Sequence, residues 1–252
     1  LLLFFGWESV FVLLALYAAV MLPLLILALP EPLPPERRQS IHPAVIFGNF
    51  RMLLGQRIFM GYTLTNSAAF SGLFAYLSGS SFVLIEFLGV SPFQYGLFFT
   101  LIVAGFFTGT LLSGRYSHRL GRERLVGLAS LTCALGGSLM AVLALSEVFA
   151  AWAVVGPHVL FMIGMGVLMP QSMTGALAPN PHCAGSASSL FGFLQMTIAA
   201  LVGGAVGQLH DGTSRTMAVV VALGGLLAVA SFLGLVRPAE RAMAQQTQGA
   251  KR

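Results

Sequence analysis

The chain has 252 residues, of which 57% are hydrophobic and only 8% are charged, and its formal net charge is +5 at pH 7. An ordinary soluble domain has about 25% charged residues, so a soluble fold of this composition would expose unusually large apolar areas. We therefore predict an all-α, polytopic membrane protein whose first partner is the lipid bilayer. The basic residues lie in loops without interleaved aromatic side chains, so we expect no nucleic acid as a partner.

Seven stretches are long and apolar enough to cross about 30 Å of hydrocarbon, and none has Lys, Arg, Asp or Glu in its interior. These predicted spans are residues 10–29, 58–78, 95–113, 125–145, 152–174, 186–208 and 216–236. Turns rich in proline and glycine separate them. The apolar run at residues 81–87 is too short to cross the bilayer, and we expect it to pack at the outer interface.

The basic residues favour one side of this predicted topology. If the connections alternate between the two sides, one side holds Arg37, Arg38, Arg51, Arg57, Arg115, Arg119, Arg122, Arg124, Arg237, Arg241, Lys251 and Arg252. The other side holds Arg215 alone. Because cytoplasmic loops carry an excess of Lys and Arg, we predict that the first side is cytoplasmic and that the carboxyl terminus lies there.

The spans are arranged as one plus six. The first span precedes a proline-rich connection at residues 30–57, which we predict to be a cytoplasmic linker with a surface helix near residues 41–54. Six spans follow at residues 58–236 in two groups of three, an arrangement known from transporters built of inverted repeats. Residues 237–252 form a predicted cytoplasmic tail, which is polar and disordered from residue 245.

A basic hinge at residues 113–125 connects the second and third of these six spans. Its spacing is Gly114-x-x-x-His118-Arg119-x-Gly121-Arg122-x-Arg124. This spacing resembles the cytoplasmic signature of the major facilitator superfamily, with a histidine where that signature has an acidic residue. We read Gly114, Arg119, Gly121 and Arg122 as a gate between two halves of a transporter, with Gly121 permitting a turn. The alternative is that the arginines only anchor the loop in the cytoplasm.

Four other segments resemble the bicyclomycin-resistance (Bcr/CflA-type) drug/proton antiporters of that superfamily: residues 74–78, 81–86, 89–96 and 184–195. The resemblance covers only the last seven of twelve spans. It implies that residues 1–29 hold the last span of an amino-terminal half, and that the missing half is a partner of this chain. The implied fold is half of a major facilitator fold, a six-helix bundle plus one preceding span.

The same resemblance implies a multi-pass secondary transporter of the inner (cytoplasmic) membrane. Its implied activity is multidrug efflux by alternating access, in which a small amphipathic substrate is exchanged for protons, as in antibiotic resistance. A sugar or metabolite facilitator of the same fold is the alternative. A seven-span receptor would not need the basic signature, and a retinal pigment would need a lysine inside a late span, whereas Lys251 is the only lysine.

The candidates for a substrate cavity are Tyr62, Asn66, Phe70, His158 and Gln195. The first three recur at steps of four along one side of a span, and their polar groups must find partners in hydrocarbon. Gln195 is long, polar and central in its span. An aromatic cavity with a few hydrogen-bonding groups would suit amphipathic substrates, and helix packing would explain the same residues.

His158 is the one titratable residue well inside a span, so it is a candidate for proton handling. The alternative is a neutral histidine that hydrogen-bonds to a neighbouring helix. No carboxylate lies inside a span, so a coupling acid should lie in the missing half. The chain also lacks hydrolase motifs and metal-ligand spacings, so we expect no enzyme activity, catalytic residue, metal or cofactor.

Overall fold

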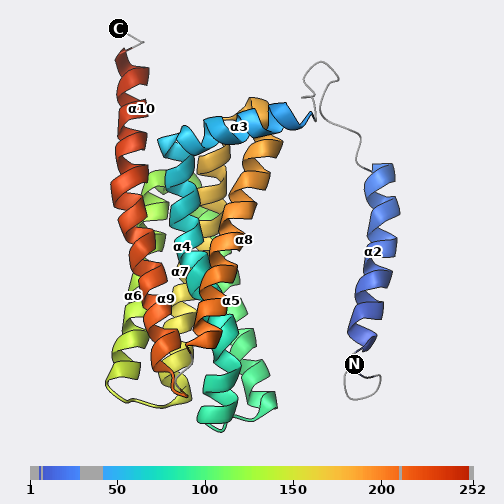
Figure 1. The fold of residues 1–252 in the computed structure, drawn as a ribbon, viewed down its shortest axis with the longest axis vertical. Coiled ribbons are helices and arrows are strands. Elements are labelled where there is room, and N and C mark those ends of the chain that lie inside the picture. Colours follow the sequence, from blue (N-terminus) through green and yellow to red (C-terminus); the bar gives the residue numbers. More distant parts are fainter. Residues whose placement is uncertain (1–5, 7, 29–41, 210–211, 250–252) are drawn as a thin grey trace. The chain divides into compact units, whose positions relative to one another are not determined.

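The computed structural model describes residue 6 and residues 8–28, 42–209 and 212–249 (Figure 1). It consists of two units, residues 1–41 and residues 42–252. The described residues contain helices and no β-strand, which confirms the all-α prediction. Arg37, Arg38, Lys251 and Arg252, which contribute to the predicted charge asymmetry, lie outside the described residues.

The first unit contains one described helix, α2 (Glu8–Ala28). Apolar side chains surround it on all sides, as expected for a helix whose solvent is lipid. Pro23 lies inside the helix, where membrane helices tolerate it more readily than soluble ones. Its limits agree closely with the predicted span at residues 10–29.

The second unit contains eight described α-helices. They are α3 (Pro43–Gly55), α4 (Arg57–Ser81), α5 (Pro92–Leu120), α6 (Arg122–Leu145), α7 (Ala151–Leu177), α8 (Ala184–Gln208), α9 (Arg215–Ser231) and α10 (Arg237–Gly249). A π-helical segment, η2 (Phe82–Phe87), extends α4, and a second, η4 (Phe232–Val236), joins α9 to α10. A 3₁₀ turn, η3 (Pro181–Cys183), precedes α8.

Seven of the described helical segments are long and apolar enough to cross a membrane, in agreement with the seven predicted spans. The sequence also explains how several of them begin and end. Ser91 caps α5 through a capping box with Gln94, and Pro92 occupies the first turn, where its missing N–H is not needed. Gly121 separates α5 from α6 with a φ of 76°, a left-handed conformation that favours glycine.

The six long helices of the second unit pack in a regular pattern. The inner helices α4 and α7 pack on each other, α5 packs on α7, and α8 packs on α4. On the other side, α6 packs on both α7 and α9, and α9 packs on α4. Exchanging the triplet α4–α5–α6 with the triplet α7–α8–α9 reproduces the same set of packed pairs. This internal symmetry supports the grouping of three plus three inferred from counting spans.

Glycines allow α5 and α6 to approach α7 closely. At the crossing of α5 and α7, a Cβ on Gly109 would collide with the carbonyl oxygen of Ile163, and one on Gly166 with that of Phe106. Where α6 crosses α7, a Cβ on Gly136 would lie 2.6 Å from the backbone nitrogen of Phe161. Without a driving force from water, membrane helices depend on such close backbone packing.

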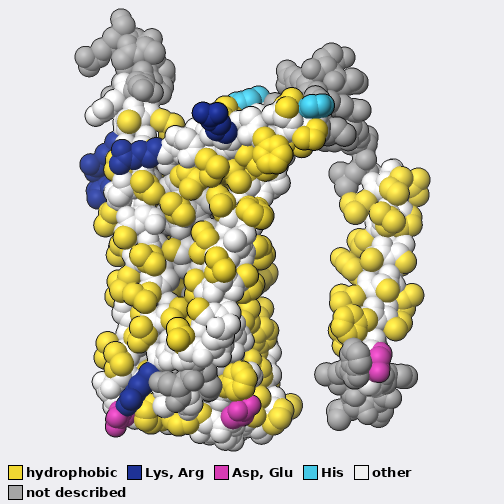
Figure 2. Space-filling view, in the orientation of Figure 1, with side chains coloured by type: hydrophobic (Ala, Val, Ile, Leu, Met, Phe, Trp, Pro, Cys, Tyr) yellow, Lys and Arg dark blue, Asp and Glu magenta, His cyan; other side chains and the backbone are white. Residues whose placement is uncertain are grey.

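Apart from Arg215, the described basic residues of the second unit gather at one of its ends. Arg57 begins α4, Arg119 lies in the last turn of α5, Arg122 begins α6, and Arg237 begins α10. Figure 2 shows Arg side chains gathered at the end near α3 and α10, and hydrophobic side chains along the length of the helices. The alternation of helix directions expected from the sequence therefore places these described residues together.

One prediction about the segments between and after the spans is refined, and another is wrong. The run at residues 81–87 does not lie in a loop, because it continues α4 as η2 and buries Val83 and Leu84 completely, and its packing at the outer interface stays a prediction. The tail is not disordered from residue 245, since α10 continues to Gly249. Its first turns pack on the bundle, and Ala239 is partly buried against the hydrophobic core.

The predicted surface helix after the linker is confirmed. Helix α3 begins at Pro43, and the His42 side chain accepts a hydrogen bond from the backbone nitrogen of Ala44 at 3.4 Å. Most of the side chains of α3 are exposed, whereas the Leu53 side chain is fully buried and belongs to the hydrophobic core. The described part of the predicted linker is therefore helical, and its residues 30–41 lie outside the described residues.

Candidate functional site

A pair of amides connects α4 to α8 inside the bundle. The Asn66 side chain donates its Nδ2 hydrogen to Oε1 of Gln195 at 2.8 Å, and both residues are buried. At a rise of about 1.5 Å per residue, Asn66 lies about 14 Å from the start of α4, near the middle of a membrane. The structure thus brings together two residues that the sequence nominated independently. Asn66 Oδ1 is buried and has no hydrogen-bond partner.

Phe70 follows Asn66 one turn later, and its ring packs against Phe74, with 5.2 Å between the ring centroids. The helical spacing places Phe70 on the same side of α4 as Asn66. Phe70 is buried and Phe74 is partly buried. The amide pair and Phe70 therefore form one polar and aromatic group, which we call the α4–α8 cluster.

Tyr62 does not belong to the α4–α8 cluster. Its ring is fully buried against Gly175 of α7, and its hydroxyl donates a hydrogen bond of 2.6 Å to Oε1 of Glu240 on α10. Arg122 interacts electrostatically with the same hydroxyl group. Tyr62 thus lies at the basic end of the bundle, one helical turn and more from Asn66.

His158 also lies apart from the amide pair. It is fully buried on α7, where its ring stacks on Tyr76 at a centroid distance of 3.8 Å and lies 5.5 Å from the Phe161 ring. Neither ring nitrogen has a hydrogen-bond partner. Tyr76 is about 15 Å further along α4 than Asn66, so the histidine and the amide pair occupy different levels of the bundle.

The signature residues lie at the junction of α5 and α6. Gly121 forms the turn, and Arg119 and Arg122 stand on either side of it. Space around Gly114 is open, since a Cβ there would meet no atom within 4 Å. On the α6 side, Glu123 lies 3.8 Å from Nε of Arg237, which begins α10. Through Arg122 and Glu123, the signature turn therefore contacts both α4 and α10.

Hydrogen bonds between amide and hydroxyl groups connect several helices at the end of the bundle that carries the signature turn. The sequence did not suggest these contacts. Gln56 and Asn180 exchange two hydrogen bonds, of 2.9 Å and 2.8 Å, between the start of α4 and the loop after α7. Asn49 of α3 donates to the Ser186 hydroxyl of α8 at 3.2 Å. The partners are separated by more than a hundred residues, so no local pattern could have paired them. Together with Tyr62 and Glu240 they form what we call the basic-end network.

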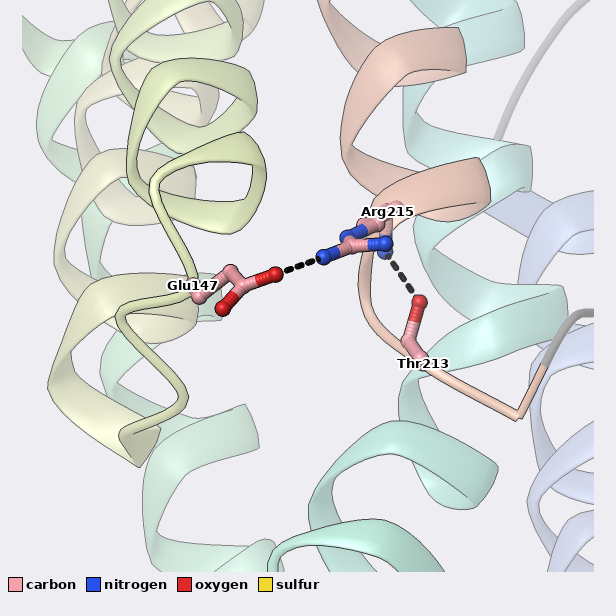
Figure 3. Close-up of polar contacts among 3 residues, drawn as sticks. All are labelled: Glu147, Thr213 and Arg215. Atoms are coloured by element: carbon pink, nitrogen blue, oxygen red, sulfur yellow. Dashed lines mark hydrogen bonds and ion pairs between the residues drawn. The ribbon is translucent and has the colours of Figure 1, made fainter.

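An ion pair lies at the opposite end of the bundle. Figure 3 shows the guanidinium group of Arg215, at the start of α9, against the carboxylate of Glu147 in the loop between α6 and α7. The Thr213 hydroxyl oxygen accepts a hydrogen bond from the Arg215 backbone nitrogen at 3.2 Å. Glu147 has a φ of 60°, a left-handed conformation that is uncommon outside glycine. The lone basic residue of this end in the predicted topology is thus paired with a carboxylate.

The outer faces of α5 and α8 remain apolar and uncovered within the second unit. Phe107 and Leu111 of α5 are well exposed, as are Phe193 and Leu201 of α8. Neither helix packs extensively on more than one other long helix of the unit. A membrane, or a further bundle of helices, would cover such faces.

These features define a class of protein: a polytopic helical membrane protein built of two packed helix triplets, with amides buried at mid-membrane depth. Residues 1–204 match the sequence pattern of the Major Facilitator Superfamily. The chain belongs to this superfamily, and its fold is a six-helix bundle of the major facilitator type together with one preceding span.

Curated relatives agree with this assignment. The chain is 28% identical over 237 residues to the "Uncharacterized MFS-type transporter YdgK" of Bacillus subtilis, covering 94% of this chain and 58% of the relative. It is 28% identical over 215 residues to the "Bicyclomycin resistance protein homolog" of Haemophilus influenzae, covering 85% and 54%. It is also 28% identical over 202 residues to "Multidrug resistance protein D" of Escherichia coli, covering 80% and 51%.

The chain therefore spans about half the length of the curated relatives it matches. The resemblance to the superfamily, and to its bicyclomycin-resistance group, is confirmed over most of the chain. Both parts of the prediction that concern the class of protein, a multi-pass membrane protein and a member of a transporter family, hold.

Proposed function

We propose that this chain is the carboxyl-terminal part of a secondary transporter of the inner membrane that exports drug-like molecules in exchange for protons. Membership of the superfamily supports transport, and the names of two relatives, which refer to bicyclomycin and multidrug resistance, support drug-like substrates. The observation that carries the proposal is the Asn66–Gln195 pair, a hydrogen-bonding group buried at mid-membrane depth.

The proposed transporter is completed by an amino-terminal half that covers the exposed apolar faces of α5 and α8. In alternating access, the substrate site lies between two such halves and opens to each side of the membrane in turn. Asn66 and Gln195 then supply hydrogen bonds to the substrate, and Phe70 supplies an apolar wall. Pockets of this kind combine mostly apolar walls with a few polar groups that orient the ligand.

Two further roles belong to the proposal. Gly114, Arg119, Gly121 and Arg122 form the gate at the cytoplasmic side, where the signature turn moves together with α10 through the Glu123–Arg237 contact. His158, whose ring nitrogens have no protein partner, takes part in proton movement. The acid that couples transport to the proton gradient lies in the other half, because the spans of this chain contain no carboxylate in their interior.

The proposed function is tested by ethidium efflux from cells that express the full-length transporter. Efflux is expected to require the proton gradient and to stop when a protonophore is added. Gln195→Leu is expected to slow efflux several-fold, because the substrate loses a hydrogen-bonding group in a site of low polarity. Thr65→Val is the matched control, since its hydroxyl donates to Gly61 of its own helix at 2.8 Å.

Efflux that continues after the gradient is removed would contradict proton coupling and favour the facilitator of sugars or metabolites. If Gln195→Leu and Thr65→Val were to behave alike at equal expression, the amide pair would have no part in the site. The 252-residue chain alone is expected to show no saturable uptake in vesicles, because a site between two halves would be incomplete.

The gate is tested separately by Arg119→Lys, which keeps the charge but changes the geometry of the hydrogen-bond donors. Reduced efflux with normal membrane insertion is the expected result. Arg115→Lys, in the same basic hinge but outside the signature spacing, is expected to have little effect. Unchanged efflux in a correctly inserted Arg119→Lys protein would show that the arginine only anchors the loop.

A further inference from the structure

A cavity of about 340 Å³ lies between α8 and α9, with α4 as its floor. Figure 1 shows α4 between these two helices, which scarcely pack on each other. The cavity is lined mainly by apolar groups, among them Ile198 and Val202 of α8 and Leu223 of α9. It is separate from the α4–α8 cluster, none of whose members lines it.

The depth of the cavity places it inside the hydrocarbon. Ser67 on α4 lies about 15 Å from the start of its helix, and Ile198 on α8 lies about 21 Å from the start of its own. A hydrocarbon core is about 30 Å thick, so these residues are near its middle. A molecule dissolved in the bilayer would meet the cavity at this depth.

Ser67 on the floor of the cavity has an unusual hydrogen-bonding state. It is 1% exposed, and its hydroxyl has no hydrogen-bond partner. Other hydroxyls of the same helix donate to a carbonyl one turn earlier: Thr63 to Phe59 at 2.8 Å, and Ser71 to Ser67 at 2.8 Å. Since an unsatisfied polar group in hydrocarbon is costly, the Ser67 hydroxyl points to a ligand that completes it.

The lining also restricts the chemistry of that ligand. None of the described residues that line the cavity is charged, so a cationic or anionic molecule would have no counter-charge at this depth. A lipid acyl chain would fill the volume but offers no acceptor to a hydroxyl near the middle of the bilayer. An uncharged molecule with a carbonyl or ether oxygen satisfies both the apolar walls and Ser67.

We propose that the α4–α8–α9 cavity is a binding site for an uncharged, bilayer-dissolved small molecule whose oxygen accepts a hydrogen bond from Ser67. Rotation about χ1 of Ser67 moves its hydroxyl between staggered positions and allows it to turn toward the bound molecule. The site faces lipid and does not depend on the proposed transport function, because its occupation is measured by labelling.

Benzophenone is a suitable probe, because it is neutral, carries one acceptor oxygen and forms covalent adducts on illumination. Membrane vesicles from cells that express the full-length protein are illuminated with increasing benzophenone, and the adducts are mapped by mass spectrometry. Saturable labelling of α8 and α9 residues around Ile198 and Leu223 is expected. Ser67→Ala is expected to raise the half-saturating concentration roughly threefold to tenfold, the effect of one neutral hydrogen bond.

Two further variants complete the experiment. Ser130→Ala makes the same chemical change at a buried serine of α6, whose hydroxyl donates to Gly127 at 2.9 Å, and should leave the labelling unchanged. Ala68→Phe fills the cavity from its floor and should abolish the saturable labelling. Labelling that never saturates, or that is equal in Ser67→Ala and the parent protein, would overturn the proposal. The proposal would also be overturned if a phospholipid with a photoreactive acyl chain displaced benzophenone equally well from the parent protein and from Ser67→Ala.

Discussion

The polar side chains within the spans complete their hydrogen bonds in two different ways. Thr63 and Thr65 donate to carbonyl groups of their own helix, at 2.8 Å each, and these bonds persist however the helix is packed. Asn66 instead reaches Gln195 on another helix. Its hydrogen bond therefore depends on the contact between α4 and α8, and it contributes to holding that contact together.

Replacing either amide with leucine should weaken the packing of α4 on α8. For Asn66→Leu and Gln195→Leu we expect losses of about 1 to 2 kcal/mol in the free energy of unfolding, the upper range for hydrogen bonds between membrane helices. Thermal unfolding of the purified protein in detergent measures the change. Because both residues share one hydrogen bond, the double variant should lose less than the sum of the single losses. Fully additive losses would show that the bond contributes nothing.

At the scale of the helices, close crossings decide the packing. Helices α5 and α7 meet where Gly109 and Gly166 face backbone atoms of the other helix. The two π-helical segments occur where α4 and α9 continue beyond their regular parts, and the side chains of Leu235 and Val236 in η4 pack against Gly61 of α4. Such π-helical turns are rare and frequently occur at functional sites.

Adding a methyl group at the α5–α7 crossing should force the helices apart. Gly109→Ala and Gly166→Ala are each expected to destabilise the protein by at least about 2 kcal/mol, because the new Cβ would collide with backbone and not with a flexible side chain. Gly96→Ala, also on α5 but with nothing within 4 Å, is the control and should be neutral or slightly stabilising. Equal unfolding temperatures for Gly96→Ala and Gly109→Ala would contradict the close crossing.

The contact between α4 and α10 makes a second prediction at this scale. Tyr62→Phe removes the hydroxyl that donates to Glu240 but keeps the ring on Gly175, so the bundle should remain folded while α10 is released. Hydrogen exchange of the backbone amides at residues 239–243 should become several-fold faster, and exchange in α6 and α7 should not change. Tyr95→Phe, which removes a hydroxyl bonded to Ser80 at 3.0 Å, is the control and should leave α10 protected.

For the whole molecule, the distribution of charge and the packing pattern act together. The antiparallel arrangement of successive helices collects the other described arginines at the end that carries the basic-end network, while Arg215 is at the opposite end and is paired with Glu147. The positive-inside rule then predicts that the basic end is cytoplasmic. That assignment concerns the membrane and is independent of how the helices pack.

Single cysteines test this orientation. Both native cysteines, Cys133 and Cys183, are buried, so a membrane-impermeant maleimide should react mainly with an introduced thiol. His118→Cys in the signature turn should react in inside-out vesicles and stay unlabelled in intact cells. Glu147→Cys at the opposite end should show the reverse. The opposite labelling of the two positions would place the carboxyl terminus outside the cytoplasm.

The sequence alone determined the number and approximate positions of the spans, the turns between them and the family. These depend on local properties: apolar length against the thickness of a bilayer, a capping box at Ser91, and the spacing of glycine and arginine around Gly121. One local inference failed, and another was incomplete. The tail is polar by itself, yet α10 continues to Gly249, and the short 81–87 run is helical because α4 extends into it as η2.

The residues of the candidate site also separate into what the sequence predicted and what only the tertiary structure decided. Helical spacing grouped Tyr62 with Asn66 and Phe70, yet only tertiary packing decided that Asn66 pairs with Gln195 whereas Tyr62 turns to Glu240. Tertiary packing alone also left Ser67 without a partner beside a cavity. A hydrogen bond in a membrane protein is completed by whichever helix lies opposite, and that neighbour is set by close backbone crossings far away in the sequence. The sequence therefore specified which groups needed partners, and the fold specified which partners they found.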